Sequence, residues 1–129
     1  MGTRMKDVAK ALYDFWSSFG LPAYPENNVP YSNDGVNPVD PPYITYRITR
    51  PEWRTQVSTY ARVWYKDTSY KDITEKVDQI ESRIGEGLML STDSGFILLF
   101  KDLNFCQFEP TEDSRLKVAY LSLIEEADT

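Results

Sequence analysis

The residues of this sequence that could carry out chemistry are few and widely spaced. Its 129 residues include a single cysteine, Cys106, and no histidine, so neither a Cys–His pair nor a Ser–His triad can be assembled. Cys106 lies in the apolar-alternating stretch from Phe105 to Phe108, which favours a buried free thiol over a nucleophile. With one cysteine, the chain cannot form an internal disulfide.

Acidic side chains are the other candidates, with 20 Asp and Glu residues against 14 Lys and Arg. Asp93, Glu109, Glu112 and Asp113 could converge in space and hold Mg²⁺, as a nuclease would require. Turn residues in solvent explain the same acids more simply, and the alternating oxygen ligands of a calcium loop are missing from the sequence. We therefore expect no metal site, no cofactor and no enzymatic activity.

Charge and composition narrow the function classes further. The formal net charge of −6 argues against a nucleic-acid binder held by phosphate contacts. Aromatic residues make up 14% of the chain, but they lack the interleaved basic residues of a base-stacking surface. Aromatic side chains in such abundance suit a core and protein–protein interfaces. The length and the 41% of hydrophobic residues fit one domain with a single core.

Two amphipathic helices are predicted. The first runs from Thr3 to Phe19 with Thr3 as its cap, and the second from Ser69 to Gly85 with a capping-box-like start. On the solvated face of the second helix, Asp72 and Lys76 are suitably placed for an ion pair. Apolar residues recur at helical spacing along both: Met5, Val8, Leu12, Phe15, Trp16 and Phe19, then Tyr70, Ile73, Val77, Ile80 and Ile84.

The remaining periodicity predicts strands. Two hairpins are expected, the first with one wetter face and the second ending in the unbroken apolar run FILLF, which predicts a strand covered on both faces. A helix is the alternative for the last segment. The sequence thus predicts a single α+β domain over residues 1–129, in which a mostly antiparallel sheet of about four to six strands is flanked by two main helices. The predicted strands are Tyr43–Thr49, Gln56–Tyr65, Leu88–Leu90, Phe96–Phe100, Phe105–Phe108 and Arg115–Glu125.

The segment from Leu21 to Pro42 is predicted to be a long loop, because it holds six of the eight prolines and each removes a backbone donor. Structureless loops of this length are unusual in small domains and are commonly functional. Tyr24, Val29, Tyr31 and Val36 lie within it, although a purely solvated loop needs no such apolar groups. The loop therefore either packs back on its own domain or docks on a neighbouring molecule.

Several segments, in their order along the chain, resemble one known family. These are the N-terminal helix, LPAYPENNVP, the strand entry PPYITYRI, STYARVWYKDTSY and the closing FILLFKDLNFCQFEPTEDSRLKVAYLSL. Together they resemble the tail-terminator (tail-completion) proteins of long-tailed phages, except for a longer insertion from Tyr31 to Asp40. The resemblance implies an α/β fold and a hexameric ring on the last ring of the tail tube, which stops tube polymerisation and meets the head connector. A neck or head-completion subunit (stopper or adaptor) is the nearest alternative, and a small enzyme or ligand-binding domain the more distant one.

The same resemblance implies partners and a location. The expected partners are copies of this chain, the major tail tube protein and the head-completion or connector protein, while DNA passes through the ring without specific binding. We expect a virion protein of the tail or neck, assembled in the host cytoplasm, with no membrane contact because no apolar run approaches a membrane-spanning length. The expected interface residues are Tyr24, Val29, Tyr31, Trp53 and Trp64.

An acidic channel is also expected. Six copies would carry six times −6, or −36, around a lumen that DNA must traverse, and acidic walls repel phosphates instead of binding them. Glu109, Glu112 and Asp113 are the candidate channel-facing acids because they cluster at one turn.

Overall fold

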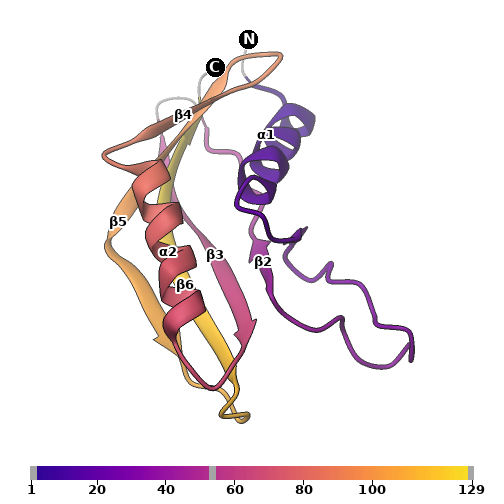
Figure 1. The fold of residues 1–129 in the computed structure, drawn as a ribbon. Coiled ribbons are helices and arrows are strands. Elements are labelled where there is room, and N and C mark those ends of the chain that lie inside the picture. Colours follow the sequence, from indigo (N-terminus) through magenta and orange to yellow (C-terminus); the bar gives the residue numbers. More distant parts are fainter. Residues whose placement is uncertain (1–2, 53–54, 128–129) are drawn as a thin grey trace.

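The computed structural model describes residues 3–52 and 55–127 and packs two helices against a six-stranded sheet (Figure 1). The strand order is β1-β2-β3-β6-β5-β4, in which β1 and β2 pair in parallel and all other neighbours are antiparallel. The predicted α+β class is confirmed. The elements are α1 (Met5–Ser17), β1 (Ala23–Pro25), β2 (Tyr43–Tyr46), β3 (Gln56–Lys66), α2 (Lys71–Ile84), β4 (Leu88–Ser91), β5 (Phe96–Glu109) and β6 (Leu116–Ala127).

Both helices cover the same face of the sheet. Ala61 and Val63 of β3 belong to one core cluster with buried residues of α1 and α2, and Figure 1 shows α2 in front of β3 and β6. Because side chains alternate along a strand, Tyr60, Arg62 and Trp64 point to the opposite side. Among the described residues no helix lies on that side, which we call the open face.

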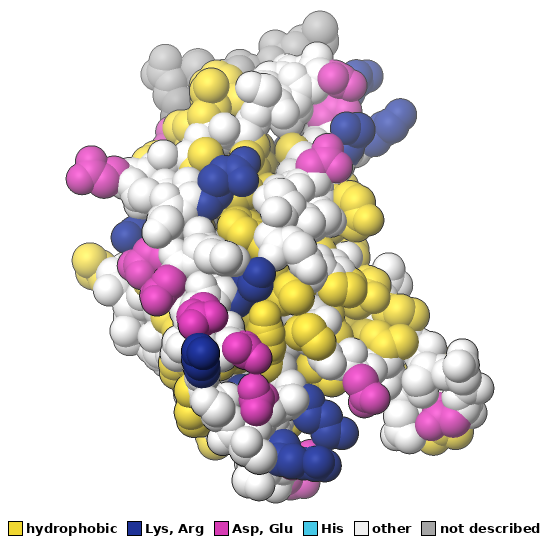
Figure 2. All heavy atoms as spheres, in the orientation of Figure 1, with side chains coloured by type: hydrophobic (Ala, Val, Ile, Leu, Met, Phe, Trp, Pro, Cys, Tyr) yellow, Lys and Arg dark blue, Asp and Glu magenta, His cyan; other side chains and the backbone are white. Residues whose placement is uncertain are grey.

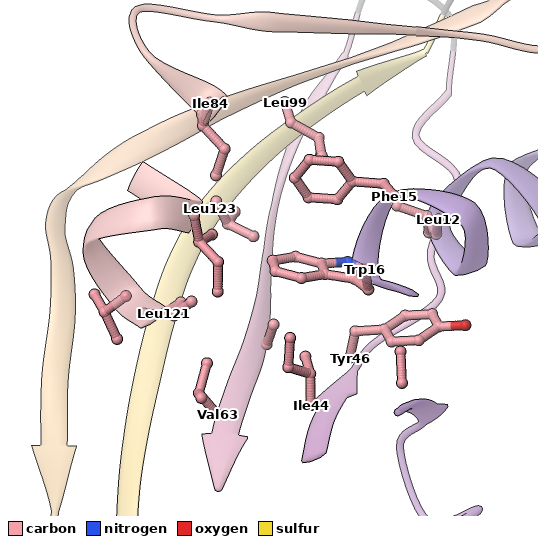
Figure 3. Packing of buried hydrophobic residues seen from close by; sticks show 14 of the residues in the cluster. Leu12, Phe15, Trp16, Ile44, Tyr46, Val63, Ile84, Leu99, Leu121 and Leu123 are labelled. Atoms are coloured by element: carbon pink, nitrogen blue, oxygen red, sulfur yellow. The ribbon is translucent and has the colours of Figure 1, made fainter. Parts of the chain in front are cut away.

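Trp16 joins α1 to the sheet at the centre of the core. Its side chain is 2% exposed, and its ring centroid lies 4.8 Å from that of Phe15 and 6.4 Å from that of Tyr46 on β2. Figure 3 shows the indole between these two rings. The two helices also meet each other, because Lys76 Nζ of α2 donates a hydrogen bond of 2.7 Å to the Phe19 carbonyl just beyond α1. None of the helices among the described residues is long and apolar enough to cross a membrane.

The helix starts differ from the predicted ones. Residue Arg4 precedes α1 without a side-chain cap, and Thr3 Oγ1 donates to the Phe96 carbonyl at 3.3 Å instead of capping the helix. Likewise, no side chain caps the start of α2 at Tyr70, and Lys76 reaches Phe19 and not Asp72. Tertiary contacts thus take the polar groups of Thr3 and Lys76 that local spacing assigned to the helices, whereas the Ser69 hydroxyl accepts the Lys71 N–H at 3.0 Å at the start of α2.

The sheet corrects two further expectations. The FILLF segment is covered on one face only: Ile97 and Leu99 are buried, whereas Phe96, Leu98 and Phe100 are half-buried on the open face. The predicted separate strand Phe105–Phe108 is the continuation of β5, which passes through a register shift between Lys101 and Cys106. The last segment is a strand, β6, as predicted, and the helical alternative is wrong.

Glu125 is the one fully buried carboxyl group among the described residues. It lies on the core face of β6, opposite Val57 of β3 and Leu99 of β5. Neither carboxyl oxygen has a hydrogen-bond partner, and burial raises the pKa of Glu125 from 4.5 to about 8. The carboxyl is therefore held mostly neutral at pH 7.

We predict that Trp16→Ala lowers the free energy of unfolding by about 3–5 kcal/mol, because it removes a buried ring and leaves a cavity between α1 and the sheet. Tyr13→Ala on the same helix is the matched control, since Tyr13 is 51% exposed, and it should change stability by less than about 1 kcal/mol. Urea denaturation measures both. Equal losses for the two variants would show that α1 is not anchored through Trp16.

We predict that Glu125→Gln gains stability relative to the wild type as pH rises. The unfolded chain loses the Glu125 proton near its ordinary pKa of 4.5, whereas the folded chain keeps it up to about pH 8. The wild type consequently loses stability between these values, by about 1.4 kcal/mol per pH unit, and the variant lacks this loss. Urea denaturation of both proteins from pH 5 to 8 is the measurement, and a difference that does not change with pH would contradict the assignment.

Candidate protein-binding groove

An aromatic row crosses the first three strands on the open face. The ring of Tyr43 on β2 lies 5.8 Å from the ring of Tyr24 on β1 and 5.8 Å from that of Trp64 on β3. Tyr43 and Trp64 are direct cross-strand partners. The Trp64 indole donates a hydrogen bond of 2.9 Å to Thr45 Oγ1, which fixes the orientation of its ring. The row is thus a rigid aromatic layer on the side of the sheet that no described helix covers, with Tyr43 buried at its centre and Tyr24 and Trp64 half-buried.

A charged cluster adjoins this row. Arg62 Nε donates to Glu109 Oε1 at 2.6 Å, and the Arg62 guanidinium carbon lies 5.0 Å from the ring centroids of both Tyr60 and Tyr120. The Tyr60 hydroxyl donates to the carboxylate of Glu26, and this hydrogen bond raises the pKa of Tyr60. The cluster fixes the chain just after β1 onto β3 and the end of β5.

Residues 26–42, which we call the arm, leave the sheet after β1 and return to it at β2. Figure 2 shows the arm standing away from the body, with acidic side chains as the charged groups visible on it. The arm is not the structureless loop expected from the sequence. Tyr31 and Pro38 form an antiparallel bridge, and the Val39 N–H donates to the Pro30 carbonyl at 2.9 Å.

Asp34 organises the tip of the arm. Its carboxylate accepts the backbone N–H groups of Val36 at 2.9 Å and Asn37 at 3.0 Å. It also accepts the Ser32 hydroxyl at 2.8 Å. The two backbone hydrogen bonds, more than any other contact, hold the pKa of Asp34 well below its usual range, so this carboxylate stays charged at neutral pH.

The arm and the open face enclose two adjoining hollows of about 560 and 370 Å³, which we call the groove. Pro38, Tyr43 and Trp64 line both hollows, so two rings of the aromatic row lie where the hollows meet. The larger hollow is otherwise lined by Ser32, Asp34, Asn37, Val39, Asp40, Pro41, Lys66, Asp113 and Leu116, and the smaller by Glu26, Asn27, Val29, Tyr31, Thr45 and Arg62.

Four of the five predicted interface residues come together at this groove. Val29, Tyr31 and Trp64 line its smaller hollow, and Tyr24 packs against the floor residue Tyr43. The fifth, Trp53, lies outside the described residues. Pattern reasoning missed Arg62 and Asp34, although the alternation of Tyr60, Arg62 and Trp64 along one strand face could have indicated the cluster.

The three predicted channel acids have different surroundings. Glu109 is paired with Arg62, so its charge is compensated within the chain. Asp113 lines the groove, and its Oδ1 accepts the Arg115 N–H at 2.9 Å. Glu112 is exposed in the same turn.

The structure does not support the sites considered for chemistry. Asp93 lies in the turn between β4 and β5, whereas Glu109 ends β5 at its opposite end, so the four acids considered for Mg²⁺ do not converge. Across residues 3–52 and 55–127, no three potential ligand side chains are grouped to hold a metal ion. Cys106 is half-buried and free, and burial raises the pKa of its thiol, which opposes thiolate formation at neutral pH.

Comparison of the chain with protein-family models, with curated proteins and with solved structures found no match in any of the three.

We predict that Asp34→Ala disorders the tip of the arm while the core stays folded. The variant removes the acceptor for the Val36 and Asn37 amides, so their hydrogen exchange should accelerate by about tenfold or more. Asn33→Ala at the neighbouring exposed position is the control and should leave exchange nearly unchanged. Exchange measured by NMR decides, and unchanged protection in Asp34→Ala would show that other contacts hold the tip.

Proposed function

We propose that this chain is a structural subunit of a phage tail, which forms the ring that caps the tail tube, stops its polymerisation and joins the tail to the head connector. The observation that carries the proposal is the open face with its arm: one side of the sheet is packed by helices, and the other presents fixed aromatic rings beside a projecting segment. Exposed aromatic and apolar groups arranged in this way are typical of protein–protein interfaces.

The arm supports self-association in particular. Tyr31 and Val36 are 67% and 75% exposed on it, and its internal hydrogen bonds reduce the entropy lost on docking. An arm that extends from one copy to a different surface on the next makes a head-to-tail contact, and such contacts close into rings when the rotation between copies allows it. The proposed location in the tail and the proposed hexamer rest on the order of sequence segments, which resembles that of the tail-terminator family.

Passage of DNA without specific binding is part of the proposal. Glu112 and Asp113 are exposed in one turn and are our candidates to face the channel. Glu109 is the weaker candidate because Arg62 lies 2.6 Å from it, whereas the cation beside Asp113, Arg115, lies 4.0 Å away. Repeated in each copy, exposed acids would repel the phosphates of DNA, within the range that salt allows.

Native mass spectrometry of the protein alone and with the major tail tube protein tests the proposal. We expect a hexamer of six times 14.9 kDa, or about 89 kDa, either alone or on tube protein. Tyr31→Asp combined with Val36→Asp should prevent it, because both substitutions place charge on the exposed arm. Tyr13→Asp at a comparably exposed site on α1 is the control and should assemble normally.

A protein that stays monomeric with and without tube protein would contradict the proposal. Association with a portal or adaptor ring but not with tube protein would instead identify a neck subunit.

A further inference from the structure

The groove has more acids than cations once the ion pairs at its lining are taken into account. Its lining includes two cations, Arg62 and Lys66. Arg62 is already paired with Glu109 at 2.6 Å, which leaves Lys66 as the one unpaired cation of the described lining. The acids of the lining are Glu26 in the smaller hollow and Asp34, Asp40 and Asp113 in the larger one. Of these, Asp113 has a cation of its own, because its Oδ1 lies 4.0 Å from Arg115 Nε.

The acidity of the arm is a feature of its sequence as well as of its geometry. From Leu21 to Tyr46 the chain contains three acids and no Lys or Arg. Asp34 is held charged by the backbone N–H groups that it accepts. Asp40 is exposed near the return of the arm into β2. The electrostatic potential over the groove therefore stays negative near neutral pH.

The floor of the groove adds a second attraction for cations. Trp64 and Tyr43 line both hollows, and the exposed ring of Tyr31 stands at the smaller one. The faces of aromatic rings attract Arg and Lys side chains, with Trp the most favourable. Acids around aromatic rings repel phosphate groups, so the same surface disfavours nucleic acid.

The shape of the groove suits an extended chain. The two hollows adjoin at Pro38, Tyr43 and Trp64, so together they follow the arm along the sheet. The polar side chains of Asn27 and Asn37 lie in separate hollows, where they can exchange hydrogen bonds with the backbone of a bound segment. Extended peptides are recognised in this way, by aromatic-lined grooves with polar groups along them.

We propose that the groove binds an extended, arginine- or lysine-bearing segment of another protein. The charge of the lining argues for a basic occupant, and the aromatic floor argues for one that places its cations over rings. This inference concerns the chemistry of a bound partner and does not depend on ring formation, so it can hold or fail independently of the proposed function.

The test is an NMR titration of the isotope-labelled chain with a short capped peptide of alternating arginine and proline, at about 0.02 M salt, where screening is weak. We expect shifts at the Trp64 indole N–H and along the arm, and progressive weakening of binding as salt is added. The matched probe has glutamate in place of arginine and should not bind. Absence of shifts, or equal binding of both peptides, would overturn the proposal.

Two variants locate the site. Asp40→Asn should weaken binding by about two- to fivefold, and Trp64→Leu by about fivefold or more, whereas Glu86→Gln, at an exposed acid outside the groove, should not change it. Asp40 is exposed, so its variant tests the proposal even if Trp64→Leu proves unstable. An unchanged affinity in Asp40→Asn would overturn the assignment. So would groove signals that depend on the concentration of the protein but not of the peptide, because they would identify a second copy as the occupant.

Discussion

The burial of one face of the sheet by both helices is the constraint on which the rest of the molecule depends. Alternate residues of β3 such as Ala61 and Val63 are buried beneath α1 and α2. Trp16 fixes α1 onto β2 through its contact with Tyr46. The register of the strands then leaves Tyr60, Arg62 and Trp64 no place except the open face. A one-residue shift of β3 would exchange the two sets, so the core and the groove are two results of the same pairing.

The polar groups of the open face find their partners within that face and not on a covering helix. Arg62 lies beside the stacked rings of Tyr60 and Tyr120 and is bonded to Glu109, so a charge that could not be buried alone is compensated locally. Polar groups at the tip of the arm are likewise satisfied within the chain, because the Asp34 carboxylate accepts hydrogen bonds from backbone N–H groups of the turn. The binding surface is therefore preorganised, and a partner that docks on it loses little conformational freedom in the protein.

The periodicity of apolar residues in the sequence was sufficient to predict those helices and strands that bury one face. The stripe with Val8, Leu12 and Trp16 predicted α1, because residues at helical spacing share one face whatever they pack against. The continuous run FILLF misled because its apolar residues on the open face are half-buried among neighbouring side chains and not beneath a helix.

Long-range contacts account for the other differences. Lys76 bonds to Phe19, 57 residues away, and no local pattern could indicate this. For the groove, sequence composition predicted Val29, Tyr31 and Trp64 as interface residues, and the structure places them at its lining. The pairing of Arg62 with Glu109 requires the β3–β6–β5 order, which the sequence alone does not provide. In the sequence Asp34 is one of several turn-forming residues. Its role as acceptor of backbone N–H groups depends on the path of the arm.

Hydrogen–deuterium exchange tests most directly whether the open face and the arm are the surface through which this chain associates. The comparison is between the dilute free protein and the protein assembled on tail tubes. The account predicts that protection increases along residues 29–39 and around Trp64, while the outward sides of α1 and α2 exchange as before. Protection gained only on the helices, with the arm unchanged, would contradict it.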